Sequence, residues 1–145
     1  MDGGGRDDLL LPAGGSLKPA SAETVAAREH FQRQNGRTVF KFAVSQMAEC
    51  VERLLQRHGL TAADIAVVIP HQANQRILDA TADRLGLPRE RMASVIARYG
   101  NTTAATLPLA LDDVVRAGRL ARGDLVVFVA VGAGFTAGAS LVRWG

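Results

Sequence analysis

Two continuous apolar runs, at residues 65–70 and 125–131, constrain the fold of this chain more than any other feature. Both have the length of a strand and are rich in Val, a composition typical of strands buried on both faces of an α/β sheet. Shorter segments at 92–96 and 138–144 also have the pattern of strands, and helical patterns lie between the runs. The order helix, strand, helix, strand, helix, strand, strand predicts an α/β fold, a sheet covered by helices that ends in an antiparallel pair of strands.

The helices are predicted from the spacing of apolar residues and from the residues that start or stop a helix. Residues 40–58 carry an apolar stripe at i, i+3, i+4, i+7 spacing, and Gly59 has the position of a C-terminal cap. A second helix begins at Asn74 or just before it and ends at Gly86, and a third covers about 103–117.

The first 21 residues have a different character, because glycines and prolines interrupt them throughout. We expect residues 1–21 to form an irregular arm, with Ser21 as the N-cap of a short helix, and residues 22–145 to form the α/β domain. A compact domain seldom begins with so long an arm. The start therefore resembles the middle of a longer chain, in which the arm packs against another part of the protein.

The cysteine count and the length of the apolar runs bound the compartment. Cys50 is the only cysteine, so an internal disulfide is impossible, and we expect a cytoplasmic protein. No apolar run approaches the roughly 18–20 residues that span a membrane. His30 and His58 lack partners at ligand spacing, so we expect no metal site, and we expect no cofactor.

The charge pattern argues against a nucleic-acid partner. The formal net charge is only +3, and the arginines alternate with acids along the predicted helices. Basic runs and interleaved aromatic residues, which bind and stack nucleic acid, are missing. Solvated helix faces account for this pattern, and a basic patch for an acidic protein partner is the alternative.

Two polar side chains follow predicted strands, and both could carry chemistry. His71 comes directly after Pro70, and Asn101 lies thirty residues further on. Functional groups collect at strand carboxyl ends in open α/β sheets, and an imidazole and an amide there can donate hydrogen bonds to a thioester carbonyl. The alternatives are a helix cap at His71 and ordinary turn chemistry at Asn101. If they form a site, their side-chain nitrogens should lie within about 5 Å of each other.

Other candidates are weaker. The Gly-Ala-Gly segment at 132–134 either lets a backbone N–H approach a ligand closely or simply forms a hairpin turn. Asn74 is either a helix cap or a second polar group that faces the same pocket. Cys50 lies in the middle of a helix without an activating base, so we interpret it as an ordinary helix cysteine. The chain therefore offers two hydrogen-bonding groups without a nucleophile.

Four segments carry a resemblance to a known family. They are Val-Phe-Lys-Phe-Ala-Val at 39–44, Pro-His-Gln-Ala-Asn-Gln-Arg-Ile at 70–77, Tyr-Gly-Asn-Thr-Thr-Ala-Ala at 99–105 and Gly-Ala-Gly-Phe-Thr at 132–136. In this order and spacing, they resemble the C-terminal half of β-ketoacyl-acyl-carrier-protein synthase III, a condensing enzyme of the thiolase superfamily.

The resemblance implies a thiolase-like half with a mixed, five-stranded-type sheet covered by helices. It also implies an acyltransferase of fatty acid biosynthesis, which starts the pathway by decarboxylative Claisen condensation of an acyl-CoA primer with malonyl-acyl-carrier protein. The family's site is a Cys-His-Asn triad, in which the His falls on His71 and the Asn on Asn101. The Cys belongs to the N-terminal half, which this chain lacks, so we expect the isolated chain to be inactive.

Substrate contacts and partners follow from the same resemblance. The docking arginine for the carrier protein falls on Arg76, and Arg84 lies eight residues further along the same helix face. The implied partners are the acyl-CoA and malonyl thioesters, acyl carrier protein, the missing N-terminal half and, in the full enzyme, a second copy in a homodimer. Neither nucleic acid nor a membrane is implied. The expected substrate-binding residues are Asn74, Gly132, Ala133, Gly134 and Phe135.

An alternative function stays open at this point. The chain could be a truncated, non-catalytic thiolase-like module that binds pantetheine thioesters or carrier protein. A purely structural domain is disfavoured, because both His71 and Asn101 are present. In either case, the surfaces that the family buries between its halves should leave a large exposed apolar area, so the free chain should self-associate or bind a partner half.

Overall fold

The computed structural model describes residues 1–145, which form two compact units. The first unit comprises residues 1–42 and 132–136, and the second comprises residues 43–131 and 137–145. None of the helices combines the length and the apolar character needed to cross a membrane. The predicted boundary between arm and domain after residue 21 stays a prediction.

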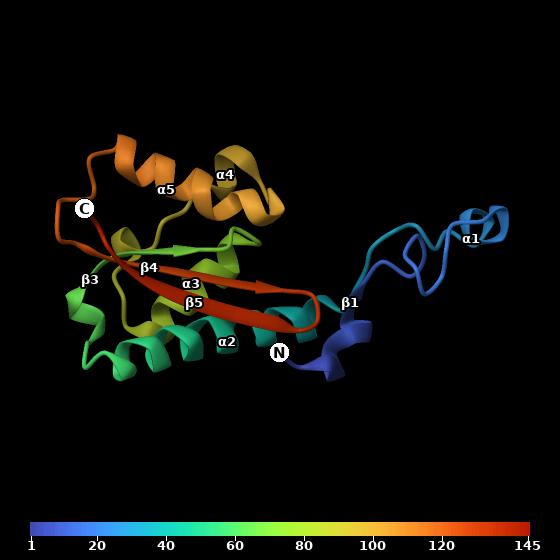
Figure 1. Ribbon diagram of the computed structural model, residues 1–145, viewed down its shortest axis with the longest axis horizontal. Helices are drawn as coiled ribbons and strands as arrows, with labels where there is room; N and C mark the ends of the chain where they lie inside the picture. Colours follow the sequence, from blue (N-terminus) through green and yellow to red (C-terminus); the bar gives the residue numbers. More distant parts are fainter. The chain divides into compact units, whose positions relative to one another are not determined.

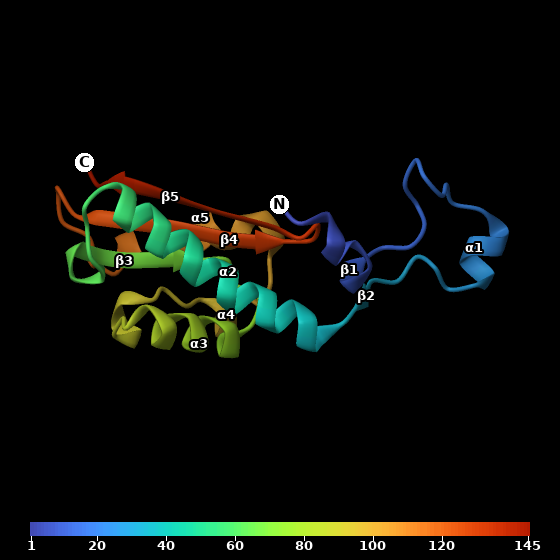
Figure 2. The same cartoon turned by 90° about the horizontal axis from the view of Figure 1, so that it is seen from below.

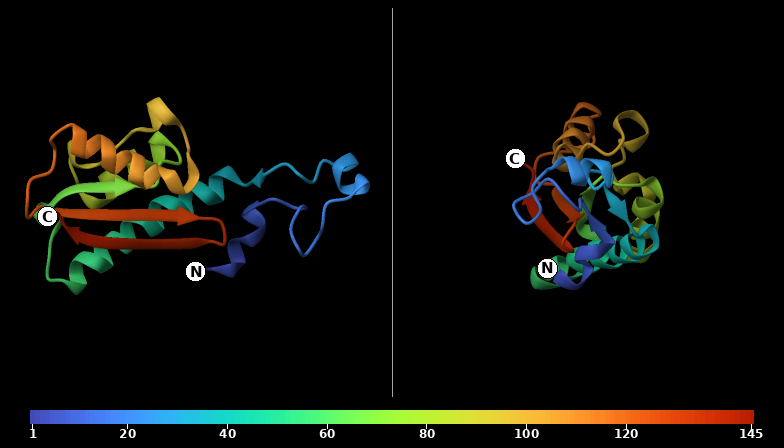
Figure 3. Two further views of the ribbon diagram at one scale, coloured as in Figure 1. Left: turned by 45° about the horizontal axis from the view of Figure 1, so that its top comes forward. Right: turned by 90° about the vertical axis from the view of Figure 1, so that its right-hand side faces the viewer.

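A three-stranded sheet in the order β3-β4-β5 is the centre of the second unit (Figure 1). β3 (Ile65–Pro70) and β4 (Leu125–Gly132) are parallel. β5 (Thr136–Arg143) runs back antiparallel to β4 (Figure 3, left). β3 is buried at nearly every position, as its continuous apolar run predicts, whereas exposed positions recur along the edge strand β5. The strands predicted at residues 65–70, 125–131 and 138–144 are therefore confirmed, and so is the antiparallel pair at the end of the chain.

Helices cover both faces of this sheet. From residue 43 onward, α2 (Gly36–Arg57) lies with α3 (Gln75–Leu85) over one face, and α5 (Thr106–Arg116) lies over the other (Figures 1 and 2). Met47 of α2 and Leu78 of α3 are fully buried, which confirms the apolar stripes. The core on the α5 side consists of Val67, Ile69, Ala93, Val95, Ala110, Val114 and Val126.

Local chemistry sets the ends of these helices. The Oδ1 atom of Asn74 accepts a hydrogen bond from the backbone N–H of Arg76 at 2.9 Å and so caps α3. Gly86 and Gly59, with φ angles of 63° and 66°, follow the ends of α3 and α2 in a conformation that favours glycine. The predicted ends are therefore confirmed. α2 begins at Gly36, before its predicted start, because its first turn is polar and lies outside the apolar stripe.

The strand predicted at residues 92–96 is wrong. After a short 3₁₀ helix η3 (Arg89–Arg91), only a single bridge joins Met92 to Val68, and the chain then enters a new helix, α4 (Ile96–Tyr99). The sheet of this unit therefore has three strands, rather than the five that the resemblance implies. Two more 3₁₀ helices complete the unit, η2 (Ala62–Asp64) and η4 (Thr103–Ala105).

The first unit contains more regular structure than the predicted arm. A 3₁₀ helix η1 (Gly3–Asp8) leads into β1 (Leu9–Leu10), which pairs antiparallel with β2 (Arg33–Gln34). The prediction that the arm is irregular throughout is therefore wrong. The strand partner of residues 9–10 comes from outside the arm, so no local pattern announces the pairing.

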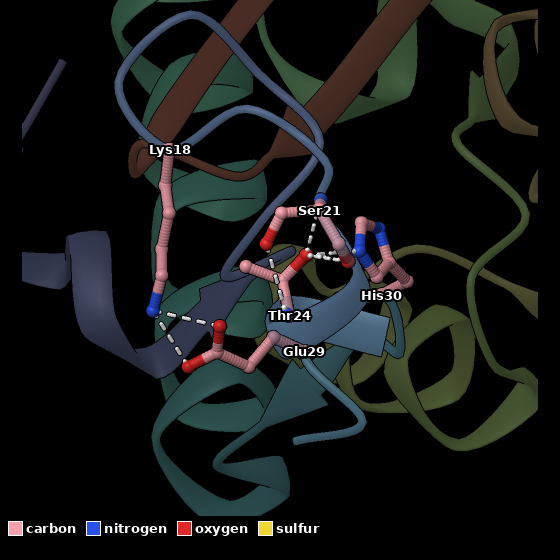
Figure 4. A network of polar contacts seen from close by, with 5 residues as sticks. All are labelled: Lys18, Ser21, Thr24, Glu29 and His30. Carbon is pink, nitrogen blue, oxygen red and sulfur yellow. Dashed lines mark hydrogen bonds and ion pairs between the residues drawn. The ribbon is translucent and has the colours of Figure 1, made fainter. Parts of the chain in front are cut away.

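The short helix predicted after Ser21 is confirmed as α1 (Ala22–Ala26). Ser21 and Thr24 form a capping box, in which each side-chain oxygen accepts a hydrogen bond from the other residue's backbone N–H (Figure 4). The buried Thr24 hydroxyl also lies 2.8 Å from Nε2 of His30. Lys18 and Glu29 form an ion pair beside this network, with 2.7 Å between Nζ and Oε2.

Candidate active site

His71 lies at the carboxyl end of β3, as predicted. Its backbone N–H donates to the carbonyl of Val129 at 2.8 Å, so the β3–β4 pairing continues to the candidate residue and fixes its backbone. The side chain is half-buried, and burial lowers the pKa of His71 below its ordinary value. Burial therefore favours the neutral form of the imidazole over the charged form.

The ring of His71 has one defined polar partner. Its Nδ1 atom lies 2.7 Å from Oγ1 of Thr106, the first residue of α5, which is only 1% exposed. The same hydroxyl donates to the carbonyl of Thr103 at 2.9 Å. These contacts join His71 to the turn that follows Asn101. Sequence reasoning missed Thr106, since its position at the start of a helix suggests only a cap.

Asn101 takes part in a tight turn. Its Oδ1 atom accepts a hydrogen bond from the backbone N–H of Thr103 at 3.0 Å, so the turn chemistry predicted as one alternative is present. Gly100, with φ 66° and ψ −158°, has a backbone conformation essentially restricted to glycine. Because Oδ1 serves the turn, the amide nitrogen of Asn101 is the group that is left to act as a donor.

Gln72 is a second residue that sequence reasoning missed. It is completely buried, and its Nε2 atom donates to the carbonyls of Pro70 and Ala93 at 2.8 and 3.1 Å. Its Oε1 atom accepts from the backbone N–H of Val95 at 2.9 Å. One side chain thus joins the end of β3 to the segment that leads to α4. A glutamine between the quoted motif residues gave no signal of this, because Ala93 and Val95 lie more than twenty residues away.

The residues predicted on α3 have mixed roles. Asn74 is a helix cap, which was one of its two alternatives, and its substrate contact stays a prediction. Arg84 lies 3.5 Å from Oε1 of Glu49, so part of its charge is already compensated. A hydrogen bond from Ser45, more than the charge of Arg84, lowers the pKa of Glu49. Docking by Arg76 and Arg84 stays a prediction.

The predicted glycine segment belongs to the first unit. Phe135 is buried and stacks on Phe42, with 4.2 Å between the ring centroids, and Gly5 packs closely on the Phe135 ring. Both rings, together with Lys41, line a hollow of about 330 Å³. Gly132, Ala133 and Gly134 are exposed, and their role in substrate binding stays a prediction.

His71 and Asn101 each keep a nitrogen that can contact a ligand oxygen. The amide nitrogen of Asn101 is a donor, and the second ring nitrogen of His71 is a donor when it carries a proton. Cys50, the one thiol, lies in the middle of α2. No group of three or more His, Cys, Asp or Glu side chains is placed to hold a metal ion.

Comparison with known proteins decides the family. Residues 55–144 match the sequence model described as 3-oxoacyl-acyl-carrier-protein synthase III, C terminal, and 3-oxoacyl is another word for β-ketoacyl. The chain belongs to the β-ketoacyl-acyl-carrier-protein synthase III family. Synthases III are condensing acyltransferases of fatty acid biosynthesis, so the predicted family is confirmed.

Members of this synthase family match nearly the whole chain. The synthase III of Solibacter usitatus is 54% identical over 144 residues, which are 99% of this chain and 44% of that protein. The synthase III of Chlorobaculum tepidum is 51% identical over 140 residues, 97% of this chain and 43% of that protein. The chain thus spans less than half the length of the synthases that it matches.

A solved structure confirms the predicted α/β, thiolase-like fold. The crystal structure of the synthase III of Pseudomonas aeruginosa PAO1 is similar with a TM-score of 0.87 and 43% sequence identity. The similarity covers 99% of this chain and 43% of the Pseudomonas chain.

Proposed function

We propose that this chain supplies the His and Asn of a synthase III site, which condenses an acyl-CoA primer with malonyl-acyl-carrier protein. The observation that carries the proposal is the contact between His71 and Thr106, since it links the imidazole to the turn built by Asn101. In the proposed site, the imidazole of His71 and the amide of Asn101 together supply the two hydrogen bonds that stabilise an enolate oxygen.

The proposed reaction needs a thiol nucleophile from the remainder of a full-length synthase. The thiolate attacks the primer thioester and releases coenzyme A. Malonyl thioester then loses CO₂, and the electron pair of the broken C–C bond forms an enolate whose oxygen His71 and Asn101 stabilise. The enolate carbon attacks the acyl-enzyme, a new C–C bond forms, and the enzyme thiolate leaves.

A chimera tests this proposal. The segment of the Solibacter usitatus synthase III that matches this chain is replaced by this chain, and β-ketoacyl product and CO₂ are measured with the unmodified synthase as reference. We expect an active chimera, and a decrease of about 10²–10³-fold in malonyl decarboxylation for His71→Ala. His58→Ala, at the exposed position directly after α2, serves as the control with unchanged activity.

The outcome also separates the alternative function. A folded chimera that binds malonyl-carrier protein but releases neither CO₂ nor product would support the non-catalytic thioester-binding module. Equal activity of the His71→Ala and His58→Ala chimeras would remove His71 from the site.

A further inference from the structure

The hydroxyl of Thr106 has two polar neighbours, and only one arrangement of hydrogens satisfies both. Its Oγ1 atom lies 2.9 Å from the carbonyl oxygen of Thr103 and 2.7 Å from Nδ1 of His71. For both contacts to be hydrogen bonds, the O–H of Thr106 has to point to Thr103, because a carbonyl oxygen can only accept and a hydroxyl has a single hydrogen. The hydrogen of the second bond must then come from Nδ1 of His71.

We infer that Thr106 is a positioning residue that holds the proton of neutral His71 on Nδ1 and leaves Nε2 as a proton acceptor. The hydroxyl is buried at the start of α5, so it has a fixed place. The backbone bond from His71 to Val129 fixes the other end of the residue. Ring orientation and tautomer are thus set together.

The role of this tautomer rests on the proposed function. With its lone pair on Nε2, His71 can donate to a thioester oxygen only after Nε2 has taken a proton. The thiol of the complete synthase is the acid that can supply this proton. Coenzyme A then leaves as its thiolate and takes a proton from solvent, and the enzyme thiolate that departs at the end of the condensation takes back the proton of Nε2. Thr106 would therefore couple activation of the nucleophile to stabilisation of the enolate.

A second pair of Thr and His in the chain provides a comparison, because there the hydroxyl contacts Nε2 of the histidine and not Nδ1. In the first unit, Thr24 donates its hydroxyl hydrogen to the carbonyl of Ser21 at 3.0 Å, and its Oγ1 atom lies 2.8 Å from Nε2 of His30 (Figure 4). The same count of hydrogens places the proton of His30 on Nε2. The two histidines should therefore show opposite tautomers in one sample.

Nitrogen NMR of the imidazole rings tests this inference on the full 145-residue chain. Spectra of ¹⁵N-histidine-labelled protein are recorded above the pH at which its histidines titrate, and His71→Gln assigns the His71 signals. We expect the Nδ1 signal of His71 at the position of a protonated ring nitrogen and its Nε2 signal at that of an unprotonated one. The His30 signals should show the reverse.

Substitutions separate positioning from simple packing. Thr106→Val keeps the shape but removes the acceptor, so the two His71 nitrogen signals should shift toward each other or exchange places. Thr106→Ser keeps the hydroxyl and should restore the native pattern. Thr24→Val should move the His30 signals alone.

An unprotonated Nδ1 of His71 in the native chain would overturn the inference, even if a variant failed to fold. An unchanged tautomer in folded Thr106→Val would overturn it as well. Both outcomes are independent of catalysis, so an inactive chimera would count against the proposed function without affecting this result.

Discussion

At the scale of single residues, Asn101 combines a structural and a proposed catalytic role, and one substitution separates them. Asn101→Asp keeps the oxygen that accepts from Thr103, and Asp forms this kind of turn as Asn does. The amide donor is lost. In the chimera, we expect thermal stability close to that of the unsubstituted protein and malonyl decarboxylation reduced about 10²–10³-fold, as for loss of one oxyanion donor.

Asn101→Ala is the companion variant, because it removes the turn oxygen together with the amide. It should lose stability as well as activity. If Asn101→Asp decarboxylates malonyl thioester at nearly the native rate, Asn101 is a turn residue only.

The buried imidazole of His71 also predicts a pH effect on stability. Burial lowers the pKa of His71 below the ordinary 6.5, so the unfolded chain binds this proton more readily than the folded chain. The stabilising contribution is therefore complete above the unfolded pKa and is lost as the pH falls through the folded pKa. We expect the unfolding free energy of the native chain to decrease more steeply below pH 6.5 than that of His71→Gln.

Urea titrations at a series of pH values measure this difference. Parallel curves for the two proteins would show that His71 keeps its ordinary pKa in the folded chain.

At the scale of elements, the three hydrogen bonds of Gln72 hold the end of β3 and residues 93–95 together. Gln72→Leu fills a similar volume but leaves the buried N–H of Val95 without its acceptor. We expect a loss of about 1–3 kcal/mol of unfolding free energy, the cost of one unsatisfied buried group. Gln56→Leu is the matched control, because the same change at this exposed position of α2 should stay within about 0.5 kcal/mol. Equal effects at both positions would contradict the role of Gln72.

Helix α3 carries the proposed docking residue, Arg76. In the chimera, Arg76→Glu should raise the KM for malonyl-carrier protein by about tenfold, the lower end of electrostatic steering, and should leave acyl-CoA priming unchanged. Arg57→Glu makes the same charge change at the end of α2 and should have little effect. A similar loss in both half-reactions for Arg76→Glu would indicate a damaged site rather than lost docking.

Sequence patterns predicted those elements whose signals are local. Gly59, Gly86 and the Ser21 cap act within a few residues, so helix ends were visible in the sequence. Residues 92–96 end in the β-branched pair Val95 and Ile96, but the N–H of Val95 bonds to Gln72 instead of a strand.

The same distinction applies to the candidate site. His71 and Asn101 were visible because each follows a strand or turn signal. Thr106, in contrast, acts on a ring 35 residues away, and no periodicity reports such a contact.

At the scale of the whole chain, the first unit lacks a core of its own. Its buried residues are Gly5, Ala13, Thr24 and Phe135, while Leu11, Leu17, Val25 and Phe31 are exposed. We expect the isolated chain to self-associate and to form no β-ketoacyl product, because it lacks the thiol nucleophile of the proposed reaction. Light scattering and a product assay measure the two properties. A monomer at high concentration would contradict the first expectation, and product formation the second, which would make Cys50 a candidate.

The polypeptide passes between its two units three times, after residues 42, 131 and 136. A protease therefore cannot release the first unit intact by a single cut, because residues 132–136 remain in the β4–β5 hairpin. A gene shortened to begin at residue 43 would still encode Phe135 but not the Phe42 ring on which it stacks. Recombination between related synthases must therefore exchange residues 1–42 and 132–136 together. Otherwise it must use parents in which the aromatic ring from one parent's hairpin can stack on the ring from the other parent.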